Sequence, residues 1–352
     1  MFSLDMDIFK EGKAKIYAQD IQLKKAMVFY NSNRIFDRSL NVLLISAIKK
    51  RHLKGLELFS GSGVRGIRLL LETKNFDSFV FNDIKTYEFL LKNLKLNNLN
   101  KKASITNLNA KLYESDMIYD YIDIDPFGSP IPYVENAFKL LKKDGLLAVS
   151  ATDTAALLGS AQRACIRKYA SLSLKTSYSN ELGIRILIKR IAELAEERGI
   201  HVRPILFNFE GNFIRIYFSL SSRKIGKIGY AYQCSKCPSR TLVEEERCDY
   251  CGSKMIKIGK LWLDSIFSRQ VVSKMILNLR SQLNNENTDL KDYLSALLKE
   301  KDIFSYYTTS EIASFFKEKE KKISKFKDRT VLSPKGFKTN LSFKDLITSL
   351  KD

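Results

Sequence analysis

LELFSGSGVRGIRLLL, residues 56–71, decides the fold that we expect for this chain. The stretch reads as an apolar strand, a glycine-rich turn and a helix, with Gly61, Gly63 and Gly66 fitting the pattern G-x-G-x-x-G. Glycine lets a backbone turn tightly and approach a ligand at the start of a helix. Asp83 follows at the end of the next apolar run, where a carboxylate accepts hydrogen bonds from ribose hydroxyls. The stretch predicts a nucleotide-binding α/β fold, a feature that nicotinamide and flavin binders share.

Around this stretch, short apolar runs alternate with helical patterns from about residue 53 to 220, which is typical of a parallel α/β sheet. We expect strands at 54–59, 78–82, 103–107, 119–124 and 145–151, and helices at 64–73, 86–97 and 181–198. Two last runs, 201–209 and 212–220, are joined by Glu210-Gly211, which is a hairpin signal. A terminal hairpin on a parallel sheet is typical of the methyltransferase variant of this fold. Another small hairpin or extended arm is expected around Glu11-Gly12.

The fourth expected strand ends in DIDPFGSP, residues 123–130, which resembles the Asp/Asn-Pro-Pro-aromatic signature of amino-directed methyltransferases. The lone pair of an exocyclic amine is delocalised into its base, so the amine attacks a sulfonium methyl poorly. A carboxylate such as Asp125 localises that lone pair and removes the developing proton. Phe127 is suited to stacking on a base, and Pro126 stiffens the turn. The competing interpretation is a plain turn, because Asp-Pro is a common turn dipeptide.

The overall charge favours a polyanionic partner. Lys and Arg number 59 against 39 Asp and Glu, which gives a net charge of +20 and a pI near 9.6. Basic side chains that neutralise phosphates release counterions, so this excess favours nucleic acid. The bland alternative is a solvated basic surface. The sequence has no apolar run of about 18 residues and no signal-peptide pattern, so we expect a cytoplasmic protein without a membrane segment.

Four of the five cysteines form two Cys-x-x-Cys pairs, Cys234 with Cys237 and Cys248 with Cys251. This spacing is typical of a tetrahedral structural zinc site. A redox dithiol pair and an iron–sulfur cluster are the alternatives. Cys165 stands alone in a helical pattern, where it is expected to be a buried small apolar residue. With only two histidines in the chain, a histidine-built catalytic metal site or a Ser-His-Asp triad is not expected.

An aromatic and an arginine lie ahead of the first strand and are candidates to fold over the pocket. Phe29 is expected to face the base opposite Phe127, and Arg38 to pair with the methionine carboxylate of the cofactor. The alternative is that an aromatic cluster near the N-terminus belongs to the core.

Several segments together resemble the tRNA (guanine-26-N2) dimethyltransferases of archaea and eukaryotes. They span nearly the whole chain, and the segments DIDPFGSP and VSATDTAALLG are the specific ones. The segments are EGKAKIY (11–17), VFYN (28–31), FDRSL (36–40), ELFSGSGVRGIR (57–68), FND (81–83), DIDPFGSP (123–130), VSATDTAALLG (149–159) and DRTVLSPKGFKTN (328–340).

The resemblance implies that Asp125 is the general base on guanine N2, with Phe29 and Phe127 sandwiching the ring. It also implies that Pro126 lends its backbone carbonyl to the amine. The cofactor implied is S-adenosylmethionine, and the residues expected to bind it are Arg38, Phe59, Ser60, Gly61, Gly63, Arg65, Asp83, Ile84, Asn109, Ala110 and Asp125.

The chain departs from the family pattern in two places near its N-terminus and one near its C-terminus. Ser32 stands where the family has Pro, and Asp37-Arg38-Ser39 stands where it has Asn-Arg-Asp. Arg38 is kept, but its acidic neighbour lies on the other side. Val331 replaces a family histidine, so any substrate role of that histidine is lost here.

We therefore expect a class I S-adenosylmethionine-dependent methyltransferase fold, a Rossmann-like seven-stranded sheet with a terminal β-hairpin. This domain would cover residues 1–222, with an N-terminal arm over about 1–50. A smaller C-terminal α+β domain, 223–352, would bind tRNA and contain a zinc knuckle at 234–251. No obligate protein partner is evident. Two alternatives stay open: an amino methyltransferase acting on adenine or cytosine in rRNA or DNA, and a non-catalytic zinc-containing nucleic-acid-binding protein.

Overall fold

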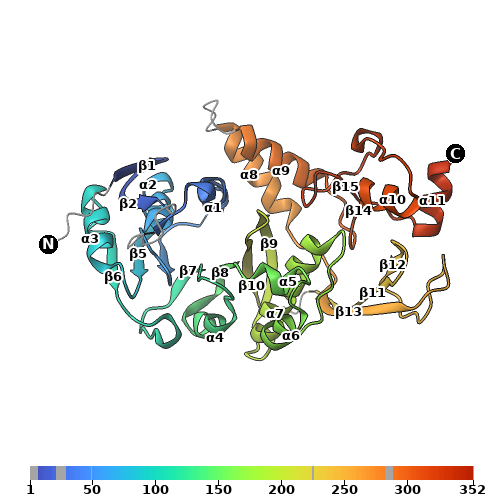
Figure 1. The fold of residues 1–352 in the computed structure, drawn as a ribbon. Helices are drawn as coiled ribbons and strands as arrows, with labels where there is room; N and C mark the ends of the chain where they lie inside the picture. Colours follow the sequence, from blue (N-terminus) through green and yellow to red (C-terminus); the bar gives the residue numbers. More distant parts are fainter. Residues whose placement is uncertain (1–6, 21–28, 49, 224–225, 282–287, 352) are drawn as a thin grey trace.

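The computed structural model describes the chain except for residues 1–6, 21–28, 49, 224–225, 282–287 and 352 (Figure 1). Its centre is a seven-stranded sheet in the order β6-β5-β4-β7-β8-β10-β9, in which β10 runs antiparallel to both of its neighbours. This order and the β9–β10 hairpin confirm the predicted class I methyltransferase sheet. The strands are β4 (Leu53–Glu57), β5 (Phe76–Asn82), β6 (Ala103–Thr106), β7 (Tyr119–Ile124), β8 (Leu141–Ala151), β9 (His201–Phe209) and β10 (Ile214–Ser221).

Helices cover both faces of this sheet, with α1 and α2 above it and α4 and α7 below it in the view of Figure 1. Gly66 explains how closely α2 approaches the strands, because a Cβ there would lie 2.4 Å from the ring of Phe81. The helices of this half are α1 (Ile35–Ala47), α2 (Val64–Glu72), α3 (Tyr87–Leu96), α4 (Ile131–Leu140), α5 (Thr154–Leu157), α6 (Gln162–Tyr169) and α7 (Ser179–Glu196).

A small sheet of β1 (Asp7–Glu11), β2 (Ala14–Asp20) and β3 (Phe29–Tyr30) precedes the 3-10 helix η1 (Ser32–Arg34). The hairpin expected around Glu11-Gly12 is present as the antiparallel pair β1–β2, and Gly12 takes a left-handed φ of 55° in its turn. The carboxylate of Glu11 is buried and pairs with Arg38 and Arg68, so this arm is fixed to the helices beside the central sheet.

The C-terminal part combines a three-stranded sheet, a two-stranded sheet and four helices among its described residues, which agrees with the predicted α+β character. The strands are β11 (Ile228–Cys234), β12 (Arg240–Thr241), β13 (Met255–Trp262), β14 (Tyr307–Thr308) and β15 (Gly336–Phe337). The helices are α8 (Arg269–Ser281), α9 (Thr288–Lys299), α10 (Thr309–Phe316) and α11 (Phe343–Lys351).

Helices α8 and α9 extend the core of the first half rather than forming a separate one. Helix α8 packs against α1, and the ring of Tyr293 on α9 meets Phe36 on α1 at 5.5 Å between centroids. The Tyr293 hydroxyl also donates to the backbone oxygen of Phe207 at 2.7 Å. The division at residue 222 stays a prediction.

None of the helices in the described part of the chain has the length and apolarity that crossing a bilayer requires.

Candidate active site and cysteine cluster

The glycine turn between β4 and α2 closes against the end of β5. Gly61 and Gly63 have φ values of 53° and 77°, which side chains rarely adopt, and a Cβ on Gly63 would lie 2.8 Å from Leu90. The backbone N–H of Gly61 donates to Asp83 Oδ2 at 2.9 Å. The turn and the predicted ribose acceptor are therefore neighbours, as dinucleotide-type sites require.

A cavity of about 520 Å³ opens beside this turn at the carboxyl ends of the strands. It brings together ten of the residues expected at the site, and Asp125 shares it with Gly61 and Asp83. The ten are Arg38, Phe59, Ser60, Gly61, Arg65, Asp83, Ile84, Asp125, Pro126 and Phe127.

Of the predicted residues whose side chains the structure describes, three do not line this cavity. Gly63 is the N-cap of α2 and shapes the turn from behind. Asn109 is exposed and caps the short helix that Ala110 begins. The side-chain amide of Asn82, the last residue of β5, hydrogen-bonds the backbone of Leu108 and so holds this loop beside β5. The assignment of Asn109 and Ala110 to the cofactor stays a prediction.

The two aromatic residues expected around the base differ in what can be said of them. Phe127 is 84% exposed and lines the cavity, so its side chain is accessible to a base. Phe29 lies in β3, but its side chain falls outside the described part of the structure. Its stacking role stays a prediction.

Asp125, the expected base, is held by arginines from three elements. Arg34 Nη1 donates to its Oδ1 at 3.2 Å, Arg65 Nη2 donates to its Oδ2 at 3.2 Å, and Arg215 Nη1 lies 3.8 Å from Oδ2. Burial raises the pKa of Asp125, but the positive charges of Arg34, Arg65 and Arg215 together lower it by more. The pKa of Asp125 therefore lies below its ordinary value. The carboxyl is therefore ionised near neutral pH.

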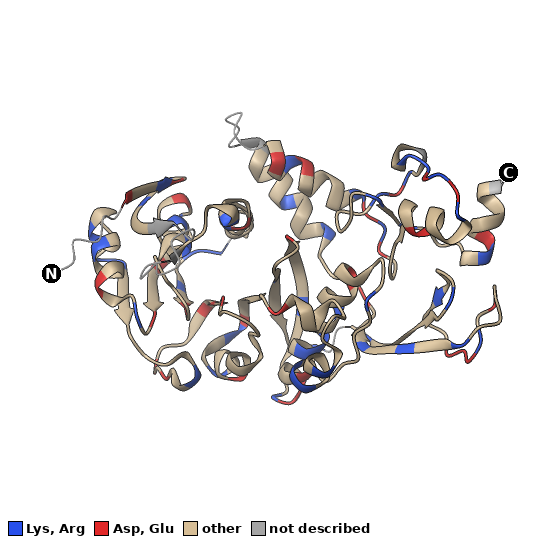
Figure 2. Cartoon of the chain, viewed as in Figure 1, with Lys and Arg blue, Asp and Glu red and all other residues tan. Residues whose placement is uncertain are grey.

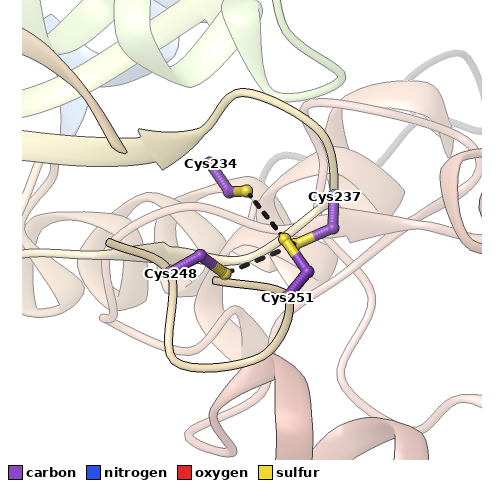
Figure 3. Close-up of side chains that lie close together, drawn as sticks. All are labelled: Cys234, Cys237, Cys248 and Cys251. Atoms are coloured by element: carbon purple, nitrogen blue, oxygen red, sulfur yellow. Dashed lines mark hydrogen bonds between the residues drawn. The ribbon is translucent and has the colours of Figure 1, made fainter. Parts of the chain in front are cut away.

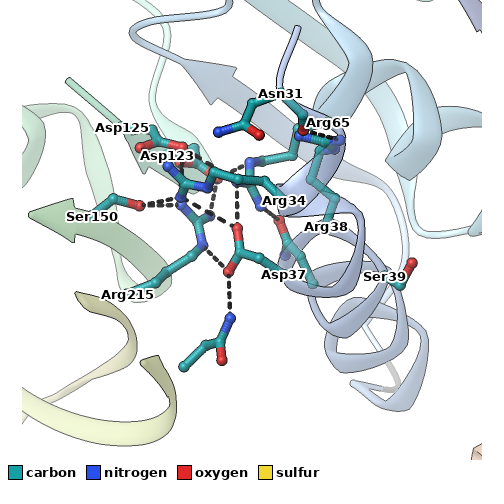
Figure 4. Close-up of polar contacts among 12 residues, drawn as sticks. Asn31, Arg34, Asp37, Arg38, Ser39, Arg65, Asp123, Asp125, Ser150 and Arg215 are labelled. Atoms are coloured by element: carbon teal, nitrogen blue, oxygen red, sulfur yellow. Dashed lines mark hydrogen bonds and ion pairs between the residues drawn. The ribbon is translucent and has the colours of Figure 1, made fainter. Parts of the chain in front are cut away.

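These contacts belong to a larger buried group that we call the cavity cluster: Arg34, Asp37, Arg65, Asp123, Asp125 and Arg215 (Figure 4). Asp37 on α1 pairs with Arg65 at 2.7 Å and with Arg34 at 3.4 Å. Asp123 on β7 accepts two hydrogen bonds from Arg215 on β10. Buried charges require such pairing, since an isolated one is costly to desolvate.

Glu57 is a further acidic residue that faces the cavity. It ends β4, its side chain is buried, and Oε2 has no hydrogen-bond partner. Burial, followed by the charge of Asp123, raises the pKa of Glu57 well above its usual value. An unpartnered buried carboxyl oxygen in a cavity is available to accept a hydrogen bond from a bound ligand.

Sequence reasoning gave no role to Arg34, Asp37, Asp123, Arg215 or Glu57. Two signals pointed to some of them. Asp123 lies two residues before Asp125 and so faces the same side of β7, and Arg215 is the one charged residue of β10. Arg38, which was expected to meet the cofactor carboxylate, lines the cavity but donates its Nε to Glu11 Oε1 at 2.8 Å.

The four paired cysteines meet, as their spacing predicts (Figure 3). The Sγ atoms of Cys234 and Cys251 are 3.4 Å apart, and those of Cys237 and Cys248 are 3.5 Å apart. A disulfide would bring sulfurs to about 2.0 Å. Four thiolates around one zinc at about 2.3 Å would lie ~3.8 Å apart, which is close to the distances seen. The cluster therefore fits a structural zinc ion.

Comparison with known proteins gives one consistent result. A family model described as N2,N2-dimethylguanosine tRNA methyltransferase matches residues 12–351. A tRNA (guanine(26)-N(2)/guanine(27)-N(2))-dimethyltransferase of Aquifex aeolicus is 31% identical over 99% of this chain and 96% of its own length. A tRNA (guanine(26)-N(2))-dimethyltransferase of Sulfolobus acidocaldarius is 30% identical, with 97% and 96% covered.

A solved structure agrees with these sequence relatives. The complex of Trm1 from Pyrococcus horikoshii with S-adenosyl-L-methionine superposes with a TM-score of 0.86 at 29% identity. The match covers 97% of this chain and 99% of that one, so both the sheet and the C-terminal part are shared.

Proposed function

The chain belongs to the N2,N2-dimethylguanosine tRNA methyltransferase family, as its sequence motifs predicted, and we propose that it methylates the exocyclic N2 of guanine 26 in tRNA. One or two methyl groups come from S-adenosylmethionine. The observation that carries this proposal is the shared cavity, which the ionised Asp125 lines together with Gly61 of the glycine turn and Asp83. The carboxylate that accepts from the guanine amine and the proposed cofactor site thus open into the same cavity.

S-adenosylmethionine fits the residues that surround the cavity, and it supplies an electrophilic methyl group on a positively charged sulfur. A volume of about 520 Å³ is within the range of ligand pockets. We propose that Asp83 accepts from the ribose hydroxyls and that the orphaned oxygen of Glu57 accepts from the methionine ammonium. Gly61 leaves room for the backbone to approach the cofactor.

Asp125 works in this proposal as an acceptor for the guanine amine. Its low pKa makes it a weak base, so it orients the N–H and localises the nitrogen lone pair rather than removing a proton beforehand. As the N–C bond forms and the C–S bond breaks, the amine becomes strongly acidic and its proton passes to Asp125. Positioning of the reacting atoms supplies most of the acceleration.

Phe127 and Phe29 are proposed to stack on the two faces of the target guanine, with the backbone carbonyl of Pro126 accepting the second N–H of the amine. The 84% exposure of Phe127 at the cavity supports this role. Stacking of a base on an aromatic ring contributes about 1–3 kcal/mol.

The C-terminal part, residues 223–352, is proposed to help hold tRNA. Lys and Arg lie along the whole chain, and the segment between α10 and β15 is strongly basic (Figure 2). A zinc ion on Cys234, Cys237, Cys248 and Cys251 would fix the knuckle beside it. A cytoplasmic location and the absence of an obligate protein partner stay predictions.

The variant Asp125→Asn tests the reaction centre. It should retain affinity for S-adenosylmethionine in calorimetry, while methyl transfer to a tRNA transcript falls by ~100-fold or more, since an amide cannot take up the proton. The matched control is Asp144→Asn, which changes a surface carboxylate paired with Lys50. Nucleoside mass spectrometry of the product checks the site of methylation. Near-normal turnover by Asp125→Asn would remove the assigned acceptor, and N6-methyladenosine as product would overturn the substrate.

A further inference from the structure

Arg34 occupies an unusual position for an arginine at the end of a one-turn helix. Its side chain is mostly buried, and its guanidinium lies over the ring of Phe213 with 3.9 Å between Cζ and the ring centroid. A cation–π contact of this kind restrains the guanidinium, whose donors form a rigid planar fork. These donors point into the cavity cluster (Figure 4).

Arg34 contacts both carboxylate oxygens of Asp125. Nη1 donates to Oδ1 at 3.2 Å, and Nη2 lies 3.2 Å from Oδ2. Nη2 also reaches Asp37 Oδ2 at 3.4 Å and Ser150 Oγ at 3.3 Å. Arg65 and Arg215, by contrast, approach Asp125 at Oδ2. Arg34 thus fixes the plane of the Asp125 carboxylate and links it to α1.

The cavity cluster contains equal numbers of the two charges. Arg34, Arg65 and Arg215 face the carboxylates of Asp37, Asp123 and Asp125, which makes three against three. Other titratable groups face the cluster from β4, β7, β10, the turn between β9 and β10, and α9. Burial raises the pKa of each of them. They are Glu57, Tyr121, Tyr217, Glu210 and Tyr293.

We propose that Arg34 is a positioning residue that completes this balance and thereby keeps the Asp125 carboxylate ionised and correctly oriented for the guanine amine. The proposal rests on the proposed function, because it assigns Arg34 a part in the same reaction. Removal of Arg34 leaves three carboxylates against two guanidinium groups. The excess charge is relieved by a proton on Asp125, because Arg34 contacts both of its carboxylate oxygens. Asp37 and Asp123 keep their ion pairs with Arg65 and Arg215. A protonated Asp125 no longer accepts the proton of the amine.

Substitution of Asp37 should compensate for the loss of the Arg34 charge. Its carboxylate sits between Arg34 and Arg65, and its charge acts on Asp125 in the opposite sense to theirs. The double variant Arg34→Met/Asp37→Asn leaves two guanidinium groups against two carboxylates, so it restores the balance although it removes two side chains from the cluster. A purely structural role predicts the reverse, that the double variant is worse than either single one.

The experiment measures kcat for methyl transfer to a tRNA transcript as a function of pH. In Arg34→Met the acidic limb of the profile should move up by roughly 1–3 pH units, the size expected for loss of a nearby opposite charge. Arg34→Lys should return the limb to its original position with a lower kcat, because lysine keeps the charge but not the planar fork. The double variant should also return the limb. Arg190→Met, which removes a partly exposed arginine of α7, is the matched control.

The outcomes separate this inference from the proposed function. If the wild-type protein makes no N2-methylguanosine, the proposed function fails and the role of Arg34 in that reaction falls with it. If the wild type is active but the limb of Arg34→Met stays in place, or the double variant leaves it displaced, the inference alone is overturned. Should Arg34→Met not fold, Arg34→Gln, which keeps an amide donor without the charge, is read by the same two criteria.

Discussion

Two groups of buried charges can be compared within this chain: the cavity cluster, and a second group around Lys338 that we call the α7 cluster. The α7 cluster consists of Glu181, Arg185, Glu300 and Lys338. Lys338 Nζ lies 3.2 Å from Glu181 Oε2 and 3.3 Å from Glu300 Oε1, and it donates to the backbone oxygen of Ile303 at 3.0 Å.

The two clusters resemble each other in composition and differ in access. In the α7 cluster every side chain is buried, and Glu300 is completed by the Thr330 hydroxyl and the Val331 N–H. In the cavity cluster Asp125 opens into a cavity of about 520 Å³. The same chemistry therefore joins α7 to the C-terminal part in one place and, in the proposed function, presents a carboxylate to the guanine amine in the other. Access, rather than burial or ion pairing, distinguishes a candidate site from a structural cluster.

The largest effect on stability is expected from Lys338→Met, which leaves two carboxyls without their shared cation. Breaking a buried ion group in this way costs ~3–5 kcal/mol of unfolding free energy, which denaturant titration measures. The surface variant Lys301→Met, whose partner is Asp328, is the control. The pH profile of kcat should not move in either variant. A displaced acidic limb in Lys338→Met would show that the two clusters are coupled and would break the comparison.

A smaller, pH-dependent effect is expected from Asp37→Asn. Burial raises the pKa of Asp37, but Arg65, Arg215 and Arg34 lower it well below the ordinary value. The ionised carboxylate therefore stabilises the fold above the unfolded-state pKa of about 4, and this contribution is lost as pH falls through the folded-state pKa. Asp37→Asn should cost ~2–3 kcal/mol near pH 7 and progressively less below about pH 4. Unfolding curves across this range give the difference, and a cost independent of pH would contradict it.

The smallest effect on stability is expected from Phe127→Ala, because the ring is already exposed. The unfolding free energy should change by no more than ~0.5 kcal/mol. Loss of base stacking should nevertheless lower kcat/KM for tRNA by roughly 5- to 150-fold, which corresponds to ~1–3 kcal/mol. Leu112→Ala, which removes another exposed apolar side chain away from the cavity, should leave both quantities unchanged. Unaltered kcat/KM in Phe127→Ala would remove the stacking role.

Features that depend on neighbouring residues were predictable from the sequence. Strand β7 has the predicted bounds, and the glycine turn and the cysteine pairs form where their spacing placed them. Each of these is a local pattern: alternation of side chains along a strand, a glycine with a left-handed backbone, or two cysteines spaced to bind one metal ion from the same turn. The carboxyl-end rule for parallel strands also brought Asp125 and Asp83 to one cavity.

Features that depend on distant segments were not predictable in this way. Arg34 meets Asp125 and Phe213, which lie 91 and 179 residues after it in the chain, and Arg38 meets Glu11 of the first hairpin. Nothing in the spacing of these residues distinguishes a pairing with protein from one with the cofactor. Nothing in the sequence explained why Asp37 stands where the family pattern has Asn. In the structure, this carboxylate forms ion pairs with Arg34 and Arg65.

Helices α8 and α9 lie on α1, although the ribosome makes them long after it. While translation proceeds, the first 221 residues carry every strand of the large sheet yet lack the cover for Phe36 and the donor for the Phe207 carbonyl. Their apolar face therefore stays open to chaperones or to other nascent chains until synthesis is nearly complete.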